Sequence, residues 1–209
     1  MMRSCSWLCR VQLIIWGLSC AYASEVDIRH YAFQREADNF GVSITARIEA
    51  PIGAVYETLT DYSKLQCLNP VIIDSKVLSY DPANRQRRVL TRFRDCILFF
   101  CKDVVKVEDL FEEQPRMVTG IVVPELSDFV AGHSVWRLSP DGTGTLMVYS
   151  AKMQPAFWVP PLIGTYLIRS SFYGEFVGTA KRIEHVSRRQ NGTYSQNSTE
   201  SKCTSLTNR

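Results

Sequence analysis

The chain has 209 residues, of which 45% are hydrophobic and 22% are charged, with 11 glycines and 9 prolines. These proportions are those of one ordinary globular domain, and they exclude a disordered, fibrous or polytopic membrane protein. The formal net charge is +3, from 24 basic and 21 acidic residues, which is too even a balance for a nucleic-acid-binding protein.

The N-terminal segment has the pattern of a secretory signal peptide. Basic residues precede a short apolar stretch at 11–18, and Ala21-Tyr22-Ala23 has the small residues of a cleavage site. The apolar stretch is shorter than the roughly 20 residues that a membrane-spanning helix needs. We therefore expect residues 1–23 to be a cleaved signal peptide and the protein to be exported, either periplasmic or secreted. A retained N-terminal anchor and a lipidated Cys20 stay open as alternatives.

The first regular elements follow a polar lead-in at 24–41. Residues 42–49 alternate apolar and polar side chains without interruption, which predicts a strand with one packed face and one wet face. Pro51 then suits the first turn of a helix, and Ile52, Val55 and Leu59 follow at helical spacing. A second short helical or turn segment is expected at 63–68.

The middle of the chain predicts an antiparallel meander. Short apolar–polar segments are separated by turn compositions, of which Asp141-Gly142-Thr143-Gly144 is the clearest hairpin connection. The expected strands cover residues 71–80, 87–94, 104–110, 117–123, 134–138 and 145–153.

A long helix is expected from Leu162 to Val186, because no proline interrupts this segment and its apolar residues repeat at helical intervals. Ser170, Gly174 and Gly178 are four residues apart, and we expect this small-residue stripe to let the helix lie close to a sheet. Residues 187–209 are polar and predict a disordered tail.

The order of elements predicts an α+β fold, in which a curved antiparallel β-sheet of six or seven strands wraps around the long C-terminal helix, with a short helix pair after the first strand. The domain itself is expected at 42–186. A curved sheet around a helix leaves a groove or cavity between them, which is a common place for a ligand.

This order resembles the START-like (SRPBCC) superfamily, in the branch of coenzyme Q-binding proteins and polyketide cyclase/dehydrase-like proteins. The resemblance rests on Ile48-Glu49-Ala50-Pro51, Thr60-Asp61-Tyr62-Ser63-Lys64-Leu65, Asn69-Pro70 and the segment 134–140 with its central Trp136. It covers residues 42–186 and implies the helix-grip arrangement described above. The export signal and the segment from Cys96 to Cys101 depart from the usual quinone-binding member.

The resemblance implies a hydrophobic small molecule as the partner, such as a lipid, a quinone or a polyketide-like compound, bound between sheet and helix. No cofactor and no metal are implied. Aromatic side chains are the expected lining, although any one of them also suits an ordinary core. The candidate ligand-binding residues are Tyr62, Phe93, Trp136, Tyr149, Phe172 and Phe176.

Two other functions stay open beside the carrier. A cyclase/dehydrase-type enzyme would use Arg92, Glu125, Asp128 or His133 to polarise a carbonyl and move a proton. The interpretation of Glu125, Asp128 and His133 as a solvated loop is favoured over a catalytic one. The third function is an interaction module with a filled core.

Four cysteines remain after the expected cleavage, at positions 67, 96, 101 and 203. On one straight strand Cys96 and Cys101 would lie roughly 16 Å apart on opposite faces, which is too far for a disulfide. If residues 97–100 instead form a hairpin tip, the two thiols oppose each other and can pair. Both arrangements stay open.

The segment from Phe157 to Ile163 is almost entirely apolar, yet its prolines exclude a central strand. An exposed apolar loop indicates an interaction site, and Trp158 suits a membrane interface. We therefore consider Phe157 and Trp158 as a membrane contact beside the cavity. The alternative, which is slightly favoured, is a lid that folds down as part of the core.

Overall fold

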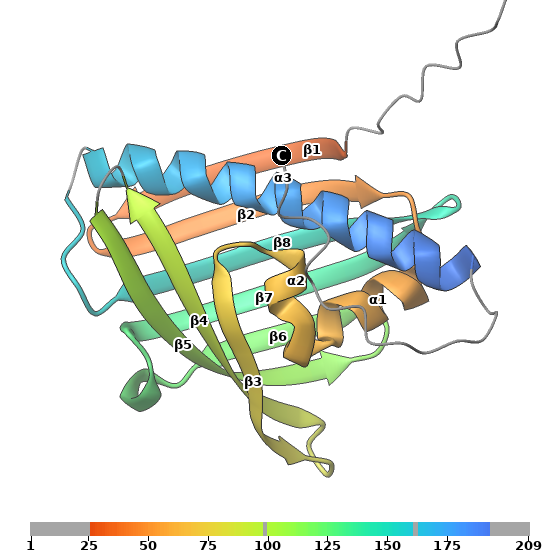
Figure 1. Cartoon of the computed structure of the whole chain (residues 1–209), viewed down its shortest axis with the longest axis horizontal. Coiled ribbons are helices and arrows are strands. Elements are labelled where there is room, and N and C mark those ends of the chain that lie inside the picture. Colours follow the sequence, from red (N-terminus) through yellow and green to blue (C-terminus); the bar gives the residue numbers. More distant parts are fainter. Residues whose placement is uncertain (1–25, 98–99, 161–162, 193–209) are drawn as a thin grey trace, which may run out of the picture.

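The computed structural model describes residues 26–97, 100–160 and 163–192, with side chains over 26–94, 102–160 and 164–190. The signal peptide predicted at 1–23 lies outside the described residues. Of the tail predicted at 187–209, residues 187–192 belong to the last helix, and the rest lies outside the described residues. Figure 1 shows a long helix lying across a strongly curved sheet, with two shorter helical segments beside it.

In the described part of the chain, eight antiparallel strands form one sheet with the order β1-β2-β8-β7-β6-β5-β4-β3. The strands are β1 (Asp27–Glu36), β2 (Asn39–Ile48), β3 (Ile72–Asp81), β4 (Gln86–Ile97), β5 (Phe100–Glu113), β6 (Met117–Val122), β7 (Phe129–Asp141) and β8 (Gly144–Pro155). The helices are α1 (Ile52–Thr60), α2 (Leu65–Leu68) and α3 (Ile163–Gly192), with 3₁₀ turns η1 (Tyr62–Lys64) and η2 (Pro124–Leu126). The predicted fold class is confirmed.

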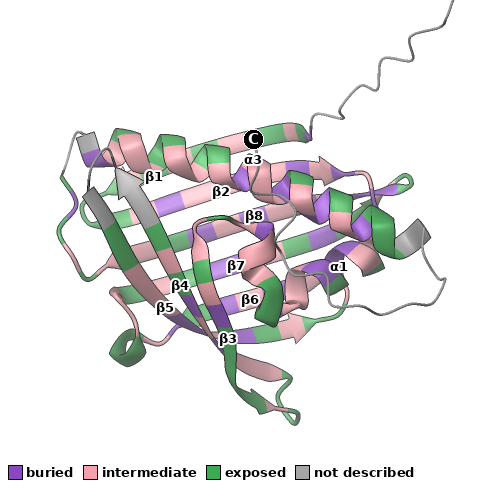
Figure 2. Cartoon of the chain, viewed as in Figure 1, coloured by how far each residue is buried: buried purple, intermediate pink, exposed green. Residues whose placement is uncertain are grey.

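The core lies between α3 and the strands that it crosses. Phe176, Ala180 and Ile183 lie on one face of α3 and are at most 5% exposed. They belong to one apolar cluster with Ile44 of β2 and Met147 of β8, which are fully buried. Figure 2 shows this arrangement, with buried residues on the strands beneath α3 and exposed ones on the β3–β4 hairpin. Burial of this apolar face is what holds the helix to the sheet.

Strand β1 lies inside the segment predicted as a polar lead-in, so the sheet has one more strand than expected. It pairs with β2 along its whole length, and a register shift between Ile28 and His30 interrupts its alternation. The shift puts Ile28 and Tyr31, an odd number of residues apart, against the same core. A search for strict period-two alternation therefore overlooks this strand. At the other end, α3 continues past Val186, where the predicted domain ended.

The small-residue stripe of α3 does not contact the sheet, so this expectation is wrong. Ser170 and Gly174 are exposed. A Cβ built on Gly174 would meet nothing within 4 Å, and one on Gly178 would meet only the Arg182 side chain, at 3.9 Å. The helix instead packs through its large residues.

We therefore expect Gly174→Ala and Gly178→Ala each to stabilise the fold by about 0.5–1 kcal/mol, because alanine removes backbone entropy from the unfolded chain without a clash. Urea unfolding of each variant measures this change. A lower free energy of unfolding for either variant would instead show that another part of the protein packs against this face of the helix.

Strands β4 and β5 form the hairpin that was one of the two alternatives for the cysteine segment. Cys96 pairs with Cys101 and Ile97 with Phe100 in the antiparallel register. The straight-strand alternative is therefore wrong. The side chains of Cys96 and Cys101 lie outside the described side chains, so their disulfide stays a prediction.

Candidate functional site

A cavity of about 410 Å³ lies between the concave face of the sheet and α3. The structure places all six predicted aromatic residues in its lining: Tyr62, Phe93, Trp136, Tyr149, Phe172 and Phe176. They come from α3, η1 and three different strands, so only the tertiary fold brings them together. Aliphatic side chains and further aromatics complete the walls, which suit an apolar ligand.

Four of these rings form one cluster. Trp136 of β7 and Tyr149 of β8 are direct partners in the antiparallel register, and their ring centroids are 4.3 Å apart. Phe172 and Phe176 share one face of α3 because they are four residues apart. Phe172 stacks on Tyr149 at 6.1 Å between centroids, and Phe176 on Trp136 at 6.0 Å. This cluster fixes the position of the helix over the sheet on one side of the cavity.

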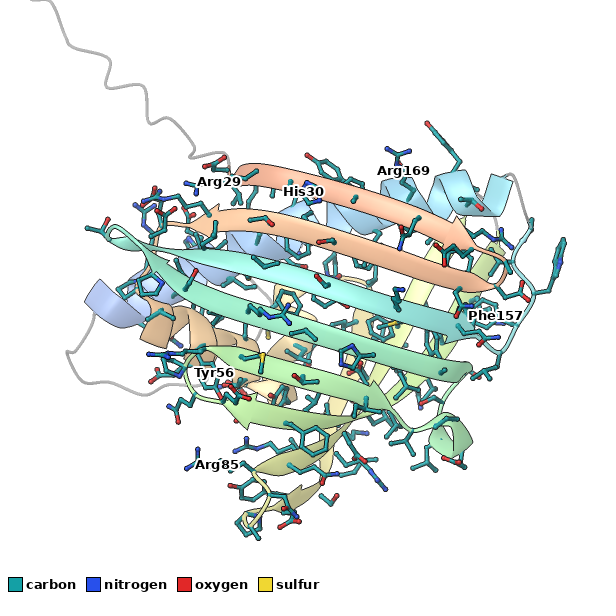
Figure 3. All side chains as sticks on the ribbon, turned by 180° about the vertical axis from the view of Figure 1, so that it is seen from behind. Arg29, His30, Tyr56, Arg85, Phe157 and Arg169 are labelled. Carbon is teal, nitrogen blue, oxygen red and sulfur yellow. The ribbon has the colours of Figure 1, made fainter. Side chains whose placement is uncertain are left out.

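Tyr62 contributes its ring to the cavity while its hydroxyl is used elsewhere. The hydroxyl donates a hydrogen bond of 2.9 Å to Glu112 of β5, and Tyr56 of α1 donates one of 3.0 Å to the same carboxylate. Arg87 of β4 forms an ion pair with Glu112 and lies over the Tyr80 ring, 4.5 Å from its centroid. The carboxylate therefore ties the helical segments α1 and η1 to the sheet. Figure 3 shows Tyr56 at the opposite end of the molecule from Phe157.

Burial, followed by the charge of Glu112, raises the pKa of Tyr62 above its ordinary value of 10.0. Burial also raises the pKa of Tyr56, with the hydrogen bond to Glu112 as the next cause, and that of Tyr149, with the charge of Glu108 as the next cause. A raised pKa in the folded state means that the stability these groups contribute is complete below pH 10 and is lost as the pH rises above it.

We therefore expect these three tyrosines to remain protonated at pH values where tyrosines of the unfolded chain ionise. Ultraviolet titration of tyrosinate, compared between native and denaturant-unfolded protein, measures the difference. The expected result is that Tyr56, Tyr62 and Tyr149 do not ionise in the folded protein near pH 10, and that they ionise only when alkali unfolds it. Reversible ionisation of all tyrosines near pH 10 in the folded protein would contradict it.

A charged pair lies inside the largely apolar cavity. Lys106 and Glu108 of β5 both line it, their charged atoms are 2.8 Å apart, and their side chains are only 12% and 10% exposed. Ser134 of β7 donates a hydrogen bond of 3.1 Å to the Glu108 carboxylate. The sequence alone does not indicate this pair, because alternation would place the neighbouring Val105 and Val107 inside and the charges outside. In the structure Val107 is 1% exposed, and its side chain lies on the other face of the strand. Its backbone N–H donates a hydrogen bond of 2.8 Å to the Ser127 hydroxyl, just after η2.

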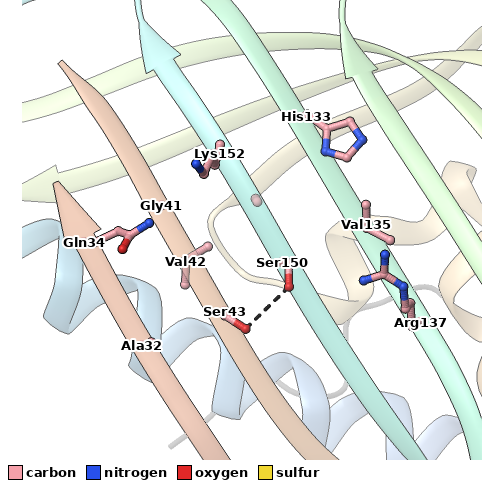
Figure 4. A pocket seen from close by; sticks show the side chains of 11 residues that line it. Ala32, Gln34, Gly41, Val42, Ser43, His133, Val135, Arg137, Ser150 and Lys152 are labelled. Atoms are coloured by element: carbon pink, nitrogen blue, oxygen red, sulfur yellow. Dashed lines mark hydrogen bonds between the residues drawn. The ribbon is translucent and has the colours of Figure 1, made fainter. Parts of the chain in front are cut away.

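The four residues considered for acid–base chemistry do not line this cavity. Arg92 and Glu125 are exposed, and the Asp128 carboxylate accepts a hydrogen bond of 2.7 Å from the backbone N–H of Val105, which pins the η2 segment to β5. His133 points outward from β7 into a second hollow, on the opposite face of the sheet (Figure 4). That hollow has polar side chains on its floor, including Ser43 and Ser150 with hydroxyl oxygens 3.4 Å apart. The structure therefore does not bring the predicted acid–base group together.

The loop between β8 and α3 divides its side chains between the cavity and the surface. Phe157 and Val159 line the cavity, and the Lys102 ammonium lies 3.6 Å from the Phe157 ring centroid. Trp158 between them is 78% exposed. Arg35 of β1 holds the backbone of this loop by hydrogen bonds to the carbonyl oxygens of Val159 and Pro160, at 3.1 and 3.2 Å. The loop therefore combines features of both interpretations, an inward lid and an outward contact.

This architecture matches a known family over most of the domain. The model of the family described as polyketide cyclase / dehydrase and lipid transport matches residues 39–182. The chain belongs to this family. The resemblance found in the sequence is thus confirmed at the level of the family, and its match begins close to the start of β2.

Solved structures with the same fold have low sequence identity to this chain. A START superfamily protein from Mycobacterium smegmatis has 15% identity and a TM-score of 0.57, over 72% of this chain and 98% of that one. The Zhui aromatase/cyclase from Streptomyces sp. R1128 has 13% identity and a TM-score of 0.58, over 73% and 96%. A STAR-related lipid transfer protein from Xanthomonas axonopodis has 15% identity and a TM-score of 0.55, over 76% and 98%. No curated protein matches the chain in sequence.

Proposed function

We propose that this protein binds one apolar small molecule, such as a lipid, a quinone or a polyketide-like compound, without covalent chemistry. The observation that carries the proposal is the cavity of about 410 Å³, which is lined by aromatic and aliphatic side chains between sheet and α3. A cavity of this size is in the range of known small-molecule sites. Membership of a family described by both cyclase/dehydrase and lipid transport is consistent with such a ligand.

Binding is favoured over catalysis because of where the titratable side chains lie. Arg92, Glu125, Asp128 and His133, which would have served a cyclase or dehydrase, are outside the cavity. Lys106 and Glu108 inside it are paired with each other.

The proposal is tested with N-phenylnaphthylamine, an uncharged apolar dye whose fluorescence rises in a dry site. We expect the mature protein to bind it, and Ala151→Trp to weaken this binding at least about tenfold, because a bulky ring on β8 then fills the cavity. Lys152→Trp is the matched control, because the next residue along a strand points to the opposite face. Thermal melts show whether both variants are folded. No dye binding by the unmodified protein would overturn the proposal.

We also propose that the protein works outside the cytoplasm. The signal-peptide pattern at 1–23 supports export, and Cys67 is disulfide-bonded, which suits an oxidising compartment. N-terminal sequencing of the protein from its host tests this, with Ser24 as the expected first residue. A soluble cytoplasmic protein that begins at Met1 would contradict it.

Ligand exchange is proposed to take place at a membrane surface, with Trp158 as the contact. Trp158 is the most exposed of the large hydrophobic residues in the described part of the chain, and its two neighbours line the cavity. An indole ring is stable at the level of lipid headgroups, where its N–H stays hydrated. Within the described residues, no helix is long and apolar enough to cross a membrane. A contact through Trp158 would lie beside Phe157 and Val159 of the cavity lining.

A further inference from the structure

The short helix α2 contains a disulfide-bonded cysteine, Cys67. The sequence offers six other cysteines as its partner, at positions 5, 9, 20, 96, 101 and 203. The first three belong to the segment that the export proposal removes as a signal peptide. In a mature protein, the partner of Cys67 is therefore Cys96, Cys101 or Cys203.

Cys96 and Cys101 already have each other within reach. They are direct partners in the antiparallel register of β4 and β5. Residues that face each other on such strands have Cα atoms about 4.5–5.5 Å apart, and this separation is within the range that a disulfide spans. A bond from Cys67 to either of them would leave the other one without the partner that the hairpin provides.

The cysteine hairpin and α2 also lie against different parts of α3. Lys102, at the hairpin, has its ammonium 3.6 Å from the ring centroid of Phe157, in the loop before α3. Leu68 of α2 accepts a hydrogen bond of 3.3 Å from Arg182 through its backbone carbonyl. From Ile163, where α3 begins, to Arg182 the helix rises by roughly 28 Å. The position of α2 therefore favours a partner near the C-terminal half of this helix.

The chain that follows α3 is long enough to return to α2. The helix ends at Gly192, about 15 Å along its axis from Arg182, which contacts α2. The residues from 193 to Cys203 can span up to roughly 36 Å when extended. Cys203 can therefore reach Cys67, with length to spare.

The residue beside Cys67 lacks a hydrogen-bond donor. The side-chain oxygen of Gln66 is buried and has no hydrogen-bond partner among the described residues, although its side-chain nitrogen donates a bond of 3.0 Å to the Ser63 carbonyl. A buried acceptor without a donor costs free energy and is rare in folded proteins. A backbone N–H of a segment that returns to Cys67 would supply this donor.

We propose that Cys67 and Cys203 form an intramolecular disulfide, which makes residues 193–202 a covalent strap from the end of α3 back to α2. The two thiols lose two protons and two electrons, and a disulfide-bearing oxidoreductase of an oxidising compartment accepts the electrons and becomes a dithiol. Leu65 and Leu68 of α2 line the cavity, so the strap holds this part of the wall to α3. The inference rests on the proposed export and is independent of ligand binding.

The test is peptide mapping of the exported, mature protein, with free thiols blocked and no reductant present. Trypsin, which cleaves after lysine and arginine, releases Cys67 in peptide 65–76 and Cys203 in peptide 203–209. It releases both hairpin cysteines together, in peptide 95–102. We expect peptide 65–76 to be linked to peptide 203–209 in protein that migrates as a monomer on a non-reducing gel.

Thermal unfolding measures what the strap does. In the unfolded chain the bond closes a ring of roughly 136 residues, whereas in the folded protein only the strap itself has to be closed. We therefore expect Cys203→Ser to lower Tm by roughly 5 °C. Cys67→Ser combined with Cys203→Ser should melt no lower than Cys67→Ser alone, because either change removes the same bond. Ser205→Ala, in the same tail, is the matched control and should leave Tm unchanged.

The outcomes separate the strap from the other proposals. A bond between peptides 65–76 and 95–102, a blocked free thiol at Cys67, or a linkage found only in dimers would each overturn the strap, whatever the protein binds. A bond from Cys67 to peptide 4–10 or 11–29 would overturn both the strap and the cleavage of the signal peptide. If Cys203→Ser melts like the unmodified protein, the bond does not hold α2 in place and the strap is wrong. Failure to bind the dye would overturn the proposed function and leave the strap standing.

Discussion

Replacing Glu112 by alanine is expected to lower the free energy of unfolding by about 2–4 kcal/mol, mainly the cost of leaving two buried hydroxyl groups without their acceptor. The Glu112 side chain is 12% exposed, and it accepts hydrogen bonds from Tyr56 and Tyr62, which are 4% and 5% exposed. Its loss leaves two buried hydroxyls without their acceptor and Arg87 without its partner. Because this carboxylate joins α1 and η1 to β5, the same change should loosen one end of the cavity.

Urea unfolding of three variants measures the effect. Glu113→Ala is the matched control, since Glu113 is the exposed neighbour on the same strand, and it should change the stability by less than about 0.5 kcal/mol. Glu112→Gln should fall between the two, because the amide oxygen still accepts from one tyrosine while the charge opposite Arg87 is gone. A loss below about 1 kcal/mol for Glu112→Ala would show that the tyrosines find other partners.

Trp158→Ser is expected to reduce binding to phospholipid vesicles by about tenfold or more without a measurable change in stability. The ring is 78% exposed in the protein, so its removal takes little from the core, whereas insertion into a headgroup layer would bury a large part of an indole. Flotation with vesicles of zwitterionic phospholipid, with and without anionic lipid, measures the binding. Equal loss from both lipid mixtures would point to the indole rather than to surface charge.

Phe157→Ser is the contrasting variant, because this side chain lines the cavity and lies under Lys102. It should cost about 1–2 kcal/mol of stability, less than a fully buried phenylalanine would. It should also weaken dye binding while leaving more of the vesicle binding than Trp158→Ser does. If the unmodified mature protein does not float with either kind of vesicle, the membrane contact is wrong.

Much of the cavity wall could be predicted before the structure was known. The family resemblance places the strands and the final helix around a common space, and it therefore predicts that their aromatic residues line this space. The structure places all six predicted residues in the lining: Tyr62, Phe93, Trp136, Tyr149, Phe172 and Phe176. Large aromatic side chains on the inward faces of several elements lie either in the core or in the wall of a cavity. The sequence leaves two alternatives for Cys96 and Cys101, a straight strand or a hairpin. Two residues that are five apart in the chain can face each other only across a tight turn, and the structure has this turn.

The same patterns did not reveal the charged pair in the cavity or the extra strand. Lys106 and Glu108 alternate with valines, and the sequence contains no sign that Val107 is buried on the face opposite the cavity. The β1 strand was missed because its register shift breaks the alternation. Gly174 and Gly178 were interpreted as a packing stripe because small residues permit close contact, but nothing in their spacing shows which side of the helix meets the sheet.

The sequence by itself determined the fold class, the family and the apolar character of the site, because periodicity and local motifs are properties of neighbouring residues. Only the tertiary structure decided which face of β5 is inside, and that Phe157 points inward while Trp158 points outward. Alternation distinguishes the two faces of a strand but does not say what covers each of them. That depends on segments distant in the chain: α3 and η1 line the same cavity as Lys106 and Glu108 of β5, and the loop before α3 is held by Arg35 of β1.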